Sequence, residues 1–324
     1  MATSFNGQNT LLNDDQISQI VADYYDVGAP IKTVLIKKGF NHNFYAETDR
    51  GQFVLRVYLN GKYYVRSRGD FQFELELLNF LVSKNLPVVR PISNTANDWL
   101  STVDIDGVDR HCALFAFVPG VNAERALEEG KFQRPQLSMI GQTLARLHQV
   151  SDEFVCQHHR YHLNLETFLL GEPLRFFGQL LAERGLGNLE FFNKRADDIR
   201  DQISPLKMHR PSYGLIHADL NVENILFSDD GTYTIIDFDH CAYGWRAYDF
   251  AVAAFQNPDM REDFQAGYEA IRPFSDLEKE LTPLFTELSR LWNHYDIARF
   301  MPLMDEELTD EHLHAFKAQL EQLS

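Results

Sequence analysis

Three oxygen-bearing side chains flank a predicted β-hairpin in the second half of the chain. Asp219 and Asn224 precede the apolar run 225–227, and Asp237 follows the run 233–236. A Ser-Asp-Asp-Gly sequence between the runs favours a turn and antiparallel pairing, which brings Asn224 and Asp237 to the same open end of the hairpin. Asp219 lies on a loop that can reach the same point. The sequence therefore predicts two carboxylates and one amide oxygen around a single position.

This set of oxygen atoms suits a hard cation such as Mg²⁺. A cation held by only a few protein ligands keeps positions open for phosphate oxygens and water. That arrangement is typical of phosphoryl transfer, in which one Asp accepts the proton of the attacking hydroxyl while other groups hold the metal. The alternative interpretation is a structural hairpin whose acidic residues are incidental.

The elements that must position these residues divide into a β-rich part and a helical part. The first part has strand-like runs and two stretches of helical spacing: 34–36, 44–48, 53–58 and 111–118 for the strands, 14–25 and 71–82 for the helices. The second part has apolar residues at helical spacing over 139–150, 163–184, 191–203 and 277–300. Pro119 and Gly120 interrupt the pattern between the two parts. We therefore expect an α+β fold with a small β-rich N-terminal lobe, 1–118, and a larger helical C-terminal lobe, 119–324.

Composition and charge exclude several functional classes. The 324 residues include 30 Lys and Arg against 47 Asp and Glu, a net charge of −17, so we expect no general nucleic-acid binding, which needs a basic surface. No run approaches the roughly 18 consecutive apolar residues of a membrane span, so we expect no membrane partner. Three separated Cys and a polar N-terminal stretch without a secretory signal indicate a cytoplasmic protein with reduced thiols. The sequence gives no indication of the oligomeric state.

The motif around the hairpin resembles a known catalytic segment. His217-x-Asp219-x4-Asn224 followed by Asp237-Phe-Asp239 is similar to the catalytic loop and metal-binding segment of protein kinases. It is more similar to the aminoglycoside phosphotransferase and choline kinase superfamily, which has no obligatory Gly after Asp-Phe. Two further landmarks of that superfamily are the runs GQTLARLH and AYDFA, at 141–148 and 247–251. The resemblance implies a protein-kinase-like bilobal fold with a catalytic β-hairpin, and a kinase that uses ATP and Mg²⁺.

The resemblance also implies roles for individual residues. Asp219 is implied to be the general base that positions the attacking hydroxyl, and Asn224 and Asp237 are implied to be Mg²⁺ ligands. Asp239 stands where protein kinases have Gly, so it is expected to bind a second metal or a cationic substrate, or to support the site from behind. Asp249 is expected either to brace the catalytic loop from a helix start or to be a plain surface N-cap.

His217, in the same motif, is expected to brace the loop rather than to carry a proton.

In the first lobe, the resemblance points to a cation that binds the nucleotide phosphates. Protein kinases use a strand Lys paired with a helix Glu, and the matching strand here has Arg56. The planar fork of Arg can bind phosphate, so this departure is chemically feasible. Glu74 is the expected partner by position, and Glu76 is the alternative. The remaining interpretation of Arg56 is a surface charge at a strand edge.

Two further segments are expected to contact the nucleotide. The loop 38–44 resembles the Gly-x-x-Asn phosphate loop of the superfamily, with Gly39 allowing a tight turn and Asn43 following it. A polar hairpin turn is the alternative for this loop. The run that ends in Phe117 and Val118 is expected to be the hinge whose backbone binds the adenine edge.

The acceptor side is less defined by the sequence. Trp292 and Tyr295 lie on the long C-terminal helical stretch, where they are expected either to line an acceptor pocket or to pack in the core. Lys62, with Arg66 and Arg68, is interpreted as part of a solvated basic loop, with contact to an acidic substrate or phosphate as the alternative.

These expectations define a kinase that phosphorylates a hydroxyl group of a small molecule of the amino alcohol, hydroxy amino acid or aminosugar type. The acidic chain is compatible with a cationic acceptor. The alternatives are a protein Ser/Thr kinase of the stress-response kinase type and a nucleotide-binding pseudokinase. A non-catalytic helical binding module is a further alternative, but it would leave the hairpin and its acids without a purpose.

Overall fold

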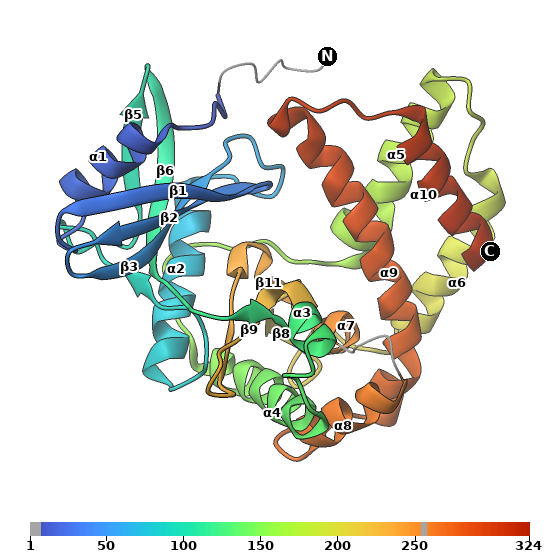
Figure 1. Ribbon diagram of the computed structural model, residues 1–324. Coiled ribbons are helices and arrows are strands. Elements are labelled where there is room, and N and C mark those ends of the chain that lie inside the picture. Colours follow the sequence, from blue (N-terminus) through green and yellow to red (C-terminus); the bar gives the residue numbers. More distant parts are fainter. Residues whose placement is uncertain (1–7, 254–257) are drawn as a thin grey trace.

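An antiparallel sheet forms the frame of the N-terminal part of this computed structural model, which describes residues 8–253 and 258–324 (Figure 1). Its six strands are β1 (Pro30–Lys38), β2 (Asn41–Thr48), β3 (Gly51–Tyr58), β4 (Pro91–Ile92), β5 (Ser101–Ile105) and β6 (Val108–Ala116). They pair in the order β1-β2-β3-β6-β4, and β5 pairs with β6. The predicted hairpin turn joins β2 to β3, with Thr48 opposite Gly51.

Two helices cover opposite faces of this sheet: α1 (Asp14–Tyr24) and α2 (Arg68–Ser83). Because side chains alternate along a strand, Leu55 and Val57 of β3 join the core beneath α1, whereas Arg56 lies on the face that carries α2. There the Arg56 guanidinium meets Glu74 of α2. The alternation along β3 therefore places a cation beneath the helix that lies between the sheet and the rest of the protein.

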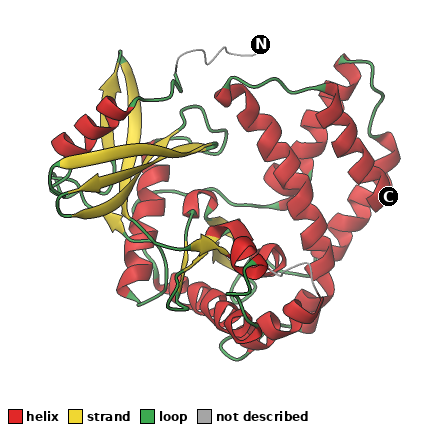
Figure 2. Cartoon of the chain, in the orientation of Figure 1, coloured by secondary structure: helices red, strands yellow, loops and turns green. Residues whose placement is uncertain are grey.

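The C-terminal part is mainly helical (Figure 2). Its helices are α3 (Ala123–Glu128), α4 (Arg134–Val150), α5 (Gly171–Glu183), α6 (Asn193–Ile203), α7 (Arg246–Ala253), α8 (Pro258–Glu269), α9 (Asp276–Phe300) and α10 (Asp310–Leu323). Its short strands are β7 (Val121–Asn122), β8 (Tyr213–Ile216), β9 (Ile225–Phe227), β10 (Tyr233–Ile235) and β11 (Ala242–Trp245). β9 and β10 form the predicted hairpin, with Ile225 opposite Ile235. None of the described helices has the apolar length that a membrane span requires.

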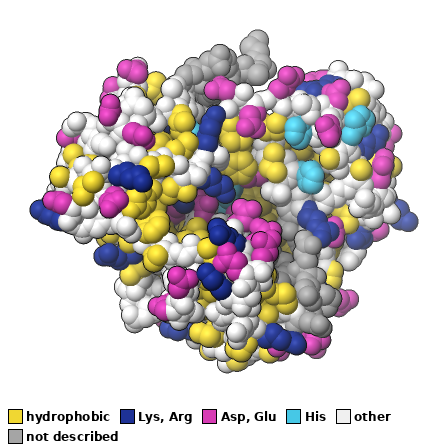
Figure 3. All heavy atoms as spheres, in the orientation of Figure 1, with side chains coloured by type: hydrophobic (Ala, Val, Ile, Leu, Met, Phe, Trp, Pro, Cys, Tyr) yellow, Lys and Arg dark blue, Asp and Glu magenta, His cyan; other side chains and the backbone are white. Residues whose placement is uncertain are grey.

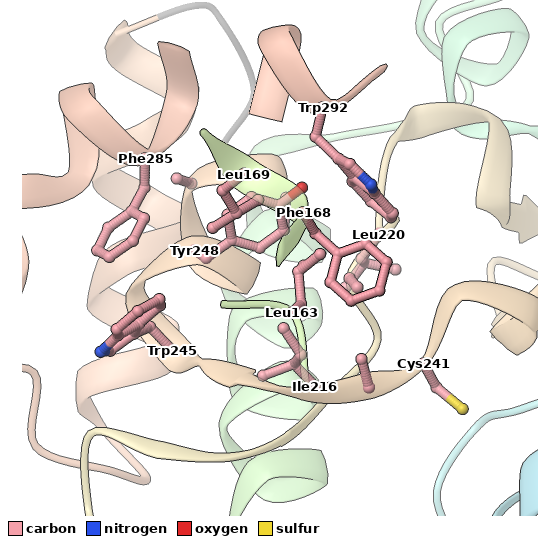
Figure 4. Close-up of a cluster of buried hydrophobic side chains, with 14 of the residues drawn as sticks. Leu163, Phe168, Leu169, Ile216, Leu220, Cys241, Trp245, Tyr248, Phe285 and Trp292 are labelled. Atoms are coloured by element: carbon pink, nitrogen blue, oxygen red, sulfur yellow. The ribbon is translucent and has the colours of Figure 1, made fainter. Parts of the chain in front are cut away.

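A continuous hydrophobic cluster supports the loop that follows β8 (Figure 4). Ile216, at the end of β8, and Leu220, in the loop, are both buried in this cluster with Phe168. Trp292 of α9 belongs to the same cluster. The segment that contains Asp219 is therefore anchored on both sides by buried side chains.

Most predicted elements are confirmed to within a few residues at each end. The single helix predicted over 163–184 is wrong, because a π-helical turn, Leu165–Leu169, precedes α5. Leu170 between them has a non-helical φ of −142°. Gly171 then approaches the Glu166 carbonyl so closely that an added Cβ would lie 2.4 Å from its oxygen. The strands β4, β5 and β7, the β8–β11 pair and the helices α3, α8 and α10 were not predicted.

The predicted lobe boundary at residue 118 falls between β6 and β7. β7 pairs with β9, so the chain has joined the C-terminal part by Val121. The boundary itself stays a prediction. The predicted lobes also include residues 1–7 and 254–257, which lie outside the described residues.

Candidate active site

The loop between β8 and β9 holds the Asp219 carboxylate in a fixed orientation. The Asn221 side-chain nitrogen donates to Asp219 Oδ1 at 2.9 Å, and the Asn224 side-chain nitrogen donates to Oδ2 at 2.9 Å. The Asn224 nitrogen also donates to the Asp219 carbonyl oxygen at 2.8 Å. Burial raises the pKa of the Asp219 carboxyl to about 7, and the negative charge of nearby Asp237 adds to the shift. Asp219 is thus a positioned carboxylate whose proton affinity suits proton transfer near neutral pH.

Asp249, at the start of α7, braces this loop from behind. Its two carboxylate oxygens accept the backbone N–H groups of His217 and Ala218, at 2.9 and 2.8 Å. His148 of α4 donates to the same carboxylate at 2.9 Å. Ala218 has a φ of 68°, a left-handed conformation that is strained for a residue with a Cβ. The buried Asp249 therefore holds a strained turn immediately before Asp219, and it is not the surface N-cap that was the alternative.

His217 links the loop between β8 and β9 to the end of the hairpin. Its Nδ1 accepts the backbone N–H of Asp219 at 3.2 Å, and its Nε2 donates to the carbonyl of Ile236 at 3.0 Å. The ring is fully buried, and burial lowers the pKa of His217. Both ring nitrogens are used for bracing, as the sequence predicted for this residue.

Asp237 follows β10 in a left-handed conformation, with φ 65° and ψ 61°. Its Oδ1 lies 3.1 Å from Nη2 of Arg56, but this buried oxygen makes no hydrogen bond. Because the Asn224 amide nitrogen is used by Asp219, the Asn224 oxygen remains available as a ligand. The donor set next to Asp219 is therefore one carboxylate and one amide oxygen, which fits a small hard cation such as Mg²⁺.

Arg56 connects three side chains across the two parts of the protein. Its Nη1 lies 3.1 Å from Glu74 Oε1, its Nη2 contacts Asp237, and its Nε donates to Asn43 Oδ1 at 3.2 Å. Burial opposes the charge on Arg56, but Asp237 and Glu74 outweigh it and raise the Arg56 pKa. Glu74, rather than Glu76, is thus the partner of Arg56, as predicted from its position. Glu76 instead contacts Cys156 and His158.

A first cavity of about 480 Å³ opens between the sheet and the hairpin. Its lining includes the predicted hinge residues Phe117 and Val118 and the side chains of Asn43 and Arg56. Asn224 and Asp237 also line it. The Phe117 N–H donates to the carbonyl of Gln52 at 3.1 Å. Among the described residues, the Phe117 carbonyl and the Val118 N–H make no backbone hydrogen bond, so both can bind a ligand.

A second cavity of about 610 Å³ is lined by the same two residues. The residues that line both cavities are Lys37, Asn43, Glu223, Asn224 and Asp237. Asp219 lines only the second cavity. Trp292 also lines it. Figure 3 shows a hollow with basic and acidic side chains between the sheet and α9, on the face it draws.

Two predicted site residues, Gly39 and Tyr295, do not line the cavity in which they were expected to bind a ligand. Gly39 lines the second cavity and not the first, so its predicted contact with the nucleotide remains an open prediction. Tyr295 is not part of the lining of either cavity. Its ring packs against Tyr63 and Phe176, and its hydroxyl accepts a bond from Arg299 at 3.2 Å.

The interpretation of Lys62 as part of a solvated loop is wrong. Lys62 is only 2% exposed, and its ammonium lies 2.5 Å from Asp239 Oδ2 and 2.7 Å from Asn41 Oδ1. Asn41 also donates to Asp239 at 2.8 Å. Burial would raise the Asp239 pKa, but the hydrogen bond and charge of Lys62, together with the nearby His240 and Arg56, outweigh burial and hold that pKa far below its usual range. Asp239 lines the second cavity, but its charge is already compensated within the protein.

Asp296 lines the second cavity and was missed at the sequence level. It lies on α9 one helical turn after Trp292 and two turns after Leu288, both of which are buried. A carboxylate within an apolar stripe of a helix is uncommon, because burial of an unpaired charge is costly. That spacing was the signal in the sequence that could have identified Asp296.

Comparison with known proteins identifies a family and relatives of this chain. The model of the phosphotransferase enzyme family matches residues 32–280. A homoserine kinase from Phenylobacterium zucineum is 29% identical over 285 residues, which are 85% of this chain and 81% of that protein. The structure of a microcompartment-associated aminopropanol kinase has a TM-score of 0.74 at 24% identity and covers 96% of this chain and 95% of its own.

An amicoumacin kinase, solved in complex with AMP-PNP, Ca²⁺ and Ami, also has a TM-score of 0.74, at 15% identity, and covers 100% of this chain and 96% of its own. At these identities the two structures are evidence for the fold alone, and they confirm the expected protein-kinase-like fold with two lobes. The family model spans well over half of the sequence. The chain therefore belongs to the phosphotransferase enzyme family.

Proposed function

We propose that this protein is a kinase that transfers the γ-phosphoryl group of ATP to a hydroxyl group of a small molecule, with Mg²⁺ as the metal ion. The observation that carries the proposal is the meeting of two cavities at Asn224 and Asp237, with Asp219 on one side only. A nucleotide in the first cavity would present its terminal phosphate at this junction. An acceptor in the second cavity would present its hydroxyl to Asp219.

In this proposal Asp219 is the general base. The acceptor hydroxyl gives its proton to the Asp219 carboxylate as its oxygen bonds to the γ-phosphorus, and the bond from that phosphorus to the bridging oxygen breaks to release ADP. Asn221 and Asn224 hold the carboxylate so that the hydroxyl is bound in a productive orientation. The Asp219 pKa of about 7 allows the carboxylate to accept a proton during the step.

Asn224 and Asp237 would hold the Mg²⁺ ion through the amide oxygen and the carboxylate. When bound, this ion neutralises charge on the phosphate oxygens. Arg56 would bind the nucleotide phosphates with its planar fork, held in place by Glu74. Phe117 and Val118 would bind the adenine edge through their backbone, and Asn43 and the turn at Gly39 would cover the phosphates.

The acceptor class is proposed from the chemistry of the second cavity. We expect an amino alcohol, a hydroxy amino acid or an aminosugar, because Asp219 and Asp296 both line this cavity and favour a cationic ligand. A homoserine kinase among the sequence relatives and an aminopropanol kinase among the structural neighbours support an acceptor of this size and type.

Thermal unfolding and ADP release test the proposal together. ATP with Mg²⁺ should raise the unfolding midpoint of the wild type, since a ligand that binds only the native state stabilises it by about 2.7 kcal/mol at a hundredfold excess over its Kd. ATP without Mg²⁺ should give a smaller shift. ADP release with a panel of hydroxyl compounds should then depend on one of them.

Variants separate binding from catalysis. Asp219→Asn should keep the Mg²⁺-dependent shift and lose ADP release, whereas Asp237→Ala should lose both. Asp229→Asn is the matched control, because the Asp229 side chain is 94% exposed and lies in the hairpin turn. A wild type that shows no shift with any nucleotide would contradict the proposed function.

A further inference from the structure

Asp296 is a buried carboxylate without a cation of its own. It is 3% exposed, and its Oδ1 accepts a hydrogen bond from Tyr63 at 2.9 Å. Its Oδ2 lies 3.4 Å from Nε2 of His240. Within the described residues, no Lys or Arg side chain forms an ion pair with it.

The groups nearest to Asp296 cannot supply the missing charge. Lys62 is engaged by Asp239 and Asn41. Burial lowers the pKa of His240 to about 4, so the imidazole is neutral at pH 7. Burial also raises the pKa of Asp296 well above its usual range, and Asp219 and Asp239 add to that shift. An ionised Asp296 therefore requires a positive charge from a ligand in the cavity.

We propose that Asp296 binds the ammonium group of the acceptor, and that the acceptor is an amino alcohol that carries no carboxylate. This inference rests on the proposed function, because it takes the second cavity to be the acceptor site. The indole of Trp292, one turn earlier on α9, lines the same cavity and offers a ring to the cation. Tyr63 would fix the carboxylate, since its hydroxyl also accepts a bond from Trp292 at 3.0 Å.

That the acceptor has no carboxylate is inferred from the positions of the Lys and Arg side chains that line the second cavity. Lys37 and Arg290 are the Lys and Arg side chains in the described lining. Lys37 also lines the first cavity, and it lies 3.6 Å from Glu223. It therefore lies where the two cavities meet, and its charge is already paired with a carboxylate of this chain.

Arg290 is too far along α9 to serve an α-amino acid bound at Asp296. The two residues are six positions apart, about 9 Å along a helix axis at the usual rise. Arg290 also turns away, because its Nη1 donates to Glu287 at 2.9 Å, towards the start of the helix. In an α-amino acid the ammonium and carboxylate are attached to one carbon. With the ammonium on Asp296, the carboxylate would face carboxylates instead of a cation, which disfavours binding.

Three matched acceptors test the inference in the intact protein. Homoserine is 3-aminopropan-1-ol with an added carboxylate, and propan-1-ol is the same compound without the amine. Affinity is measured by calorimetry with Mg²⁺ and ADP present, so that it does not depend on turnover. Turnover is measured by ADP release with Mg²⁺ and ATP. We expect 3-aminopropan-1-ol to bind about 100-fold more tightly than either of the other two compounds.

Asp296→Asn should remove this preference. It should weaken 3-aminopropan-1-ol binding about 100-fold and leave propan-1-ol binding and the Mg²⁺–ATP thermal shift unchanged. Asp296→Glu, which keeps the charge, should restore part of the affinity. Glu280→Gln is the matched control, because Glu280 is an exposed carboxylate on the same helix and lines neither cavity.

The outcomes separate this inference from the proposed function. Homoserine binding as tightly as 3-aminopropan-1-ol, or equal binding of propan-1-ol, would overturn the inference, even where ADP release shows an active kinase. Tight binding of 3-aminopropan-1-ol that is lost in Asp296→Asn would support the ammonium site. The same binding without any ADP release would count against the proposed function alone. The wild-type comparison decides the inference even if Asp296→Asn does not fold.

Discussion

Arg56 Nη2 lies 3.1 Å from Asp237 Oδ1, so an ion pair joins the third strand of the N-terminal sheet to the segment after the β9–β10 hairpin. The same guanidinium holds Glu74 of α2 and Asn43 of β2. Arg56 therefore connects the predicted phosphate-binding elements to a predicted metal ligand. A single planar group makes contacts in three directions, which an ammonium on a flexible stem does not reproduce.

Replacing Arg56 should weaken nucleotide binding. We expect Arg56→Lys to raise the Kd for Mg²⁺–ATP about tenfold, because a single ammonium cannot reach Glu74, Asp237 and Asn43 together. Arg56→Met should raise it about 100-fold, because it removes the charge as well. Calorimetric titration with Mg²⁺ and ATP measures both values. Arg50→Met, on an exposed turn where Arg50 pairs with Asp26, is the control. An unchanged Kd in Arg56→Met would remove Arg56 from the proposed phosphate site.

Breaking the buried Lys62–Asp239 pair should destabilise the protein. Lys62→Met leaves Asp239 buried without a cation, which should cost about 3–5 kcal/mol of unfolding free energy. Urea unfolding followed by circular dichroism measures this loss. Lys131→Met is the control, because the ion pairs of Lys131 are exposed and such pairs contribute little to stability.

The double variant Lys62→Met/Asp239→Leu gives a sharper test of that pair. It removes both charges and should be more stable than Lys62→Met alone, because the uncompensated carboxylate is gone. The loss in the double variant is compared with the sum of the losses in Lys62→Met and Asp239→Leu. If the two values are equal, Lys62 and Asp239 are not coupled as the structure indicates.

Local patterns explain why the hairpin could be predicted. The turn sequence, the short apolar runs and the polar residues at their ends lie within 19 positions, from Asp219 to Asp237, so antiparallel pairing alone brought the polar ends together. The Arg56–Glu74 pair was instead implied by the resemblance to kinases, and alternation along β3 explains why Arg56 lies on the α2 side of the sheet.

Contacts between distant segments could not be predicted in this way. Lys62 and Asp239 are 177 positions apart, and Tyr63 and Asp296 are 233 positions apart. Both pairs form because the loop after β3 packs against the C-terminal part, which no local periodicity specifies. Lys62 beside Tyr63 resembled an ordinary surface loop for this reason. A sequence pattern assigns a charge to a face, whereas its partner is set by the tertiary packing.

Removing the brace behind the catalytic loop should destabilise the fold. Asp249→Asn leaves one acceptor oxygen for the backbone N–H groups of His217 and Ala218 and turns an N–H₂ group towards one of them. We expect a loss of about 3 kcal/mol in unfolding free energy, because hydrogen bonds to a buried carboxylate are strong and the Ala218 conformation is strained. Urea unfolding measures it, with Asp229→Asn as the exposed control. A loss below about 1 kcal/mol would contradict the bracing role.

The same network should make stability depend on pH. Burial lowers the pKa of His148 to about 4, whereas an unfolded His titrates near 6.5. Between these values the unfolded chain binds a proton that the native state excludes. The free energy of unfolding should therefore be constant above pH 7 and fall as the pH decreases from 6.5 towards 4, by up to about 1.4 kcal/mol per pH unit for one group.

Other groups around His148 set the size of this effect without changing its sign. Asp249 and the Tyr268 hydroxyl contact its two ring nitrogens, at 2.9 and 2.8 Å, and the charges of Arg246 and Arg272 lower its pKa further. The lowered pKa of Asp249 acts in the same direction, because that carboxylate also loses its stabilising contribution on acidification.

A variant separates His148 from the remaining titrating groups. His148→Gln can still donate to Asp249 and accept from Tyr268, but it does not titrate. Its unfolding free energy is measured in urea at pH 7.5, 6.5, 5.5 and 5.0. With decreasing pH it should fall less steeply than that of the wild type, and the difference in slope should correspond to the uptake of at most one proton on unfolding. Equal slopes would mean that His148 is already protonated in the native state. In that case the imidazole would carry a charge against Asp249, and the contact that holds the strained turn before Asp219 would be a buried ion pair rather than a neutral hydrogen bond.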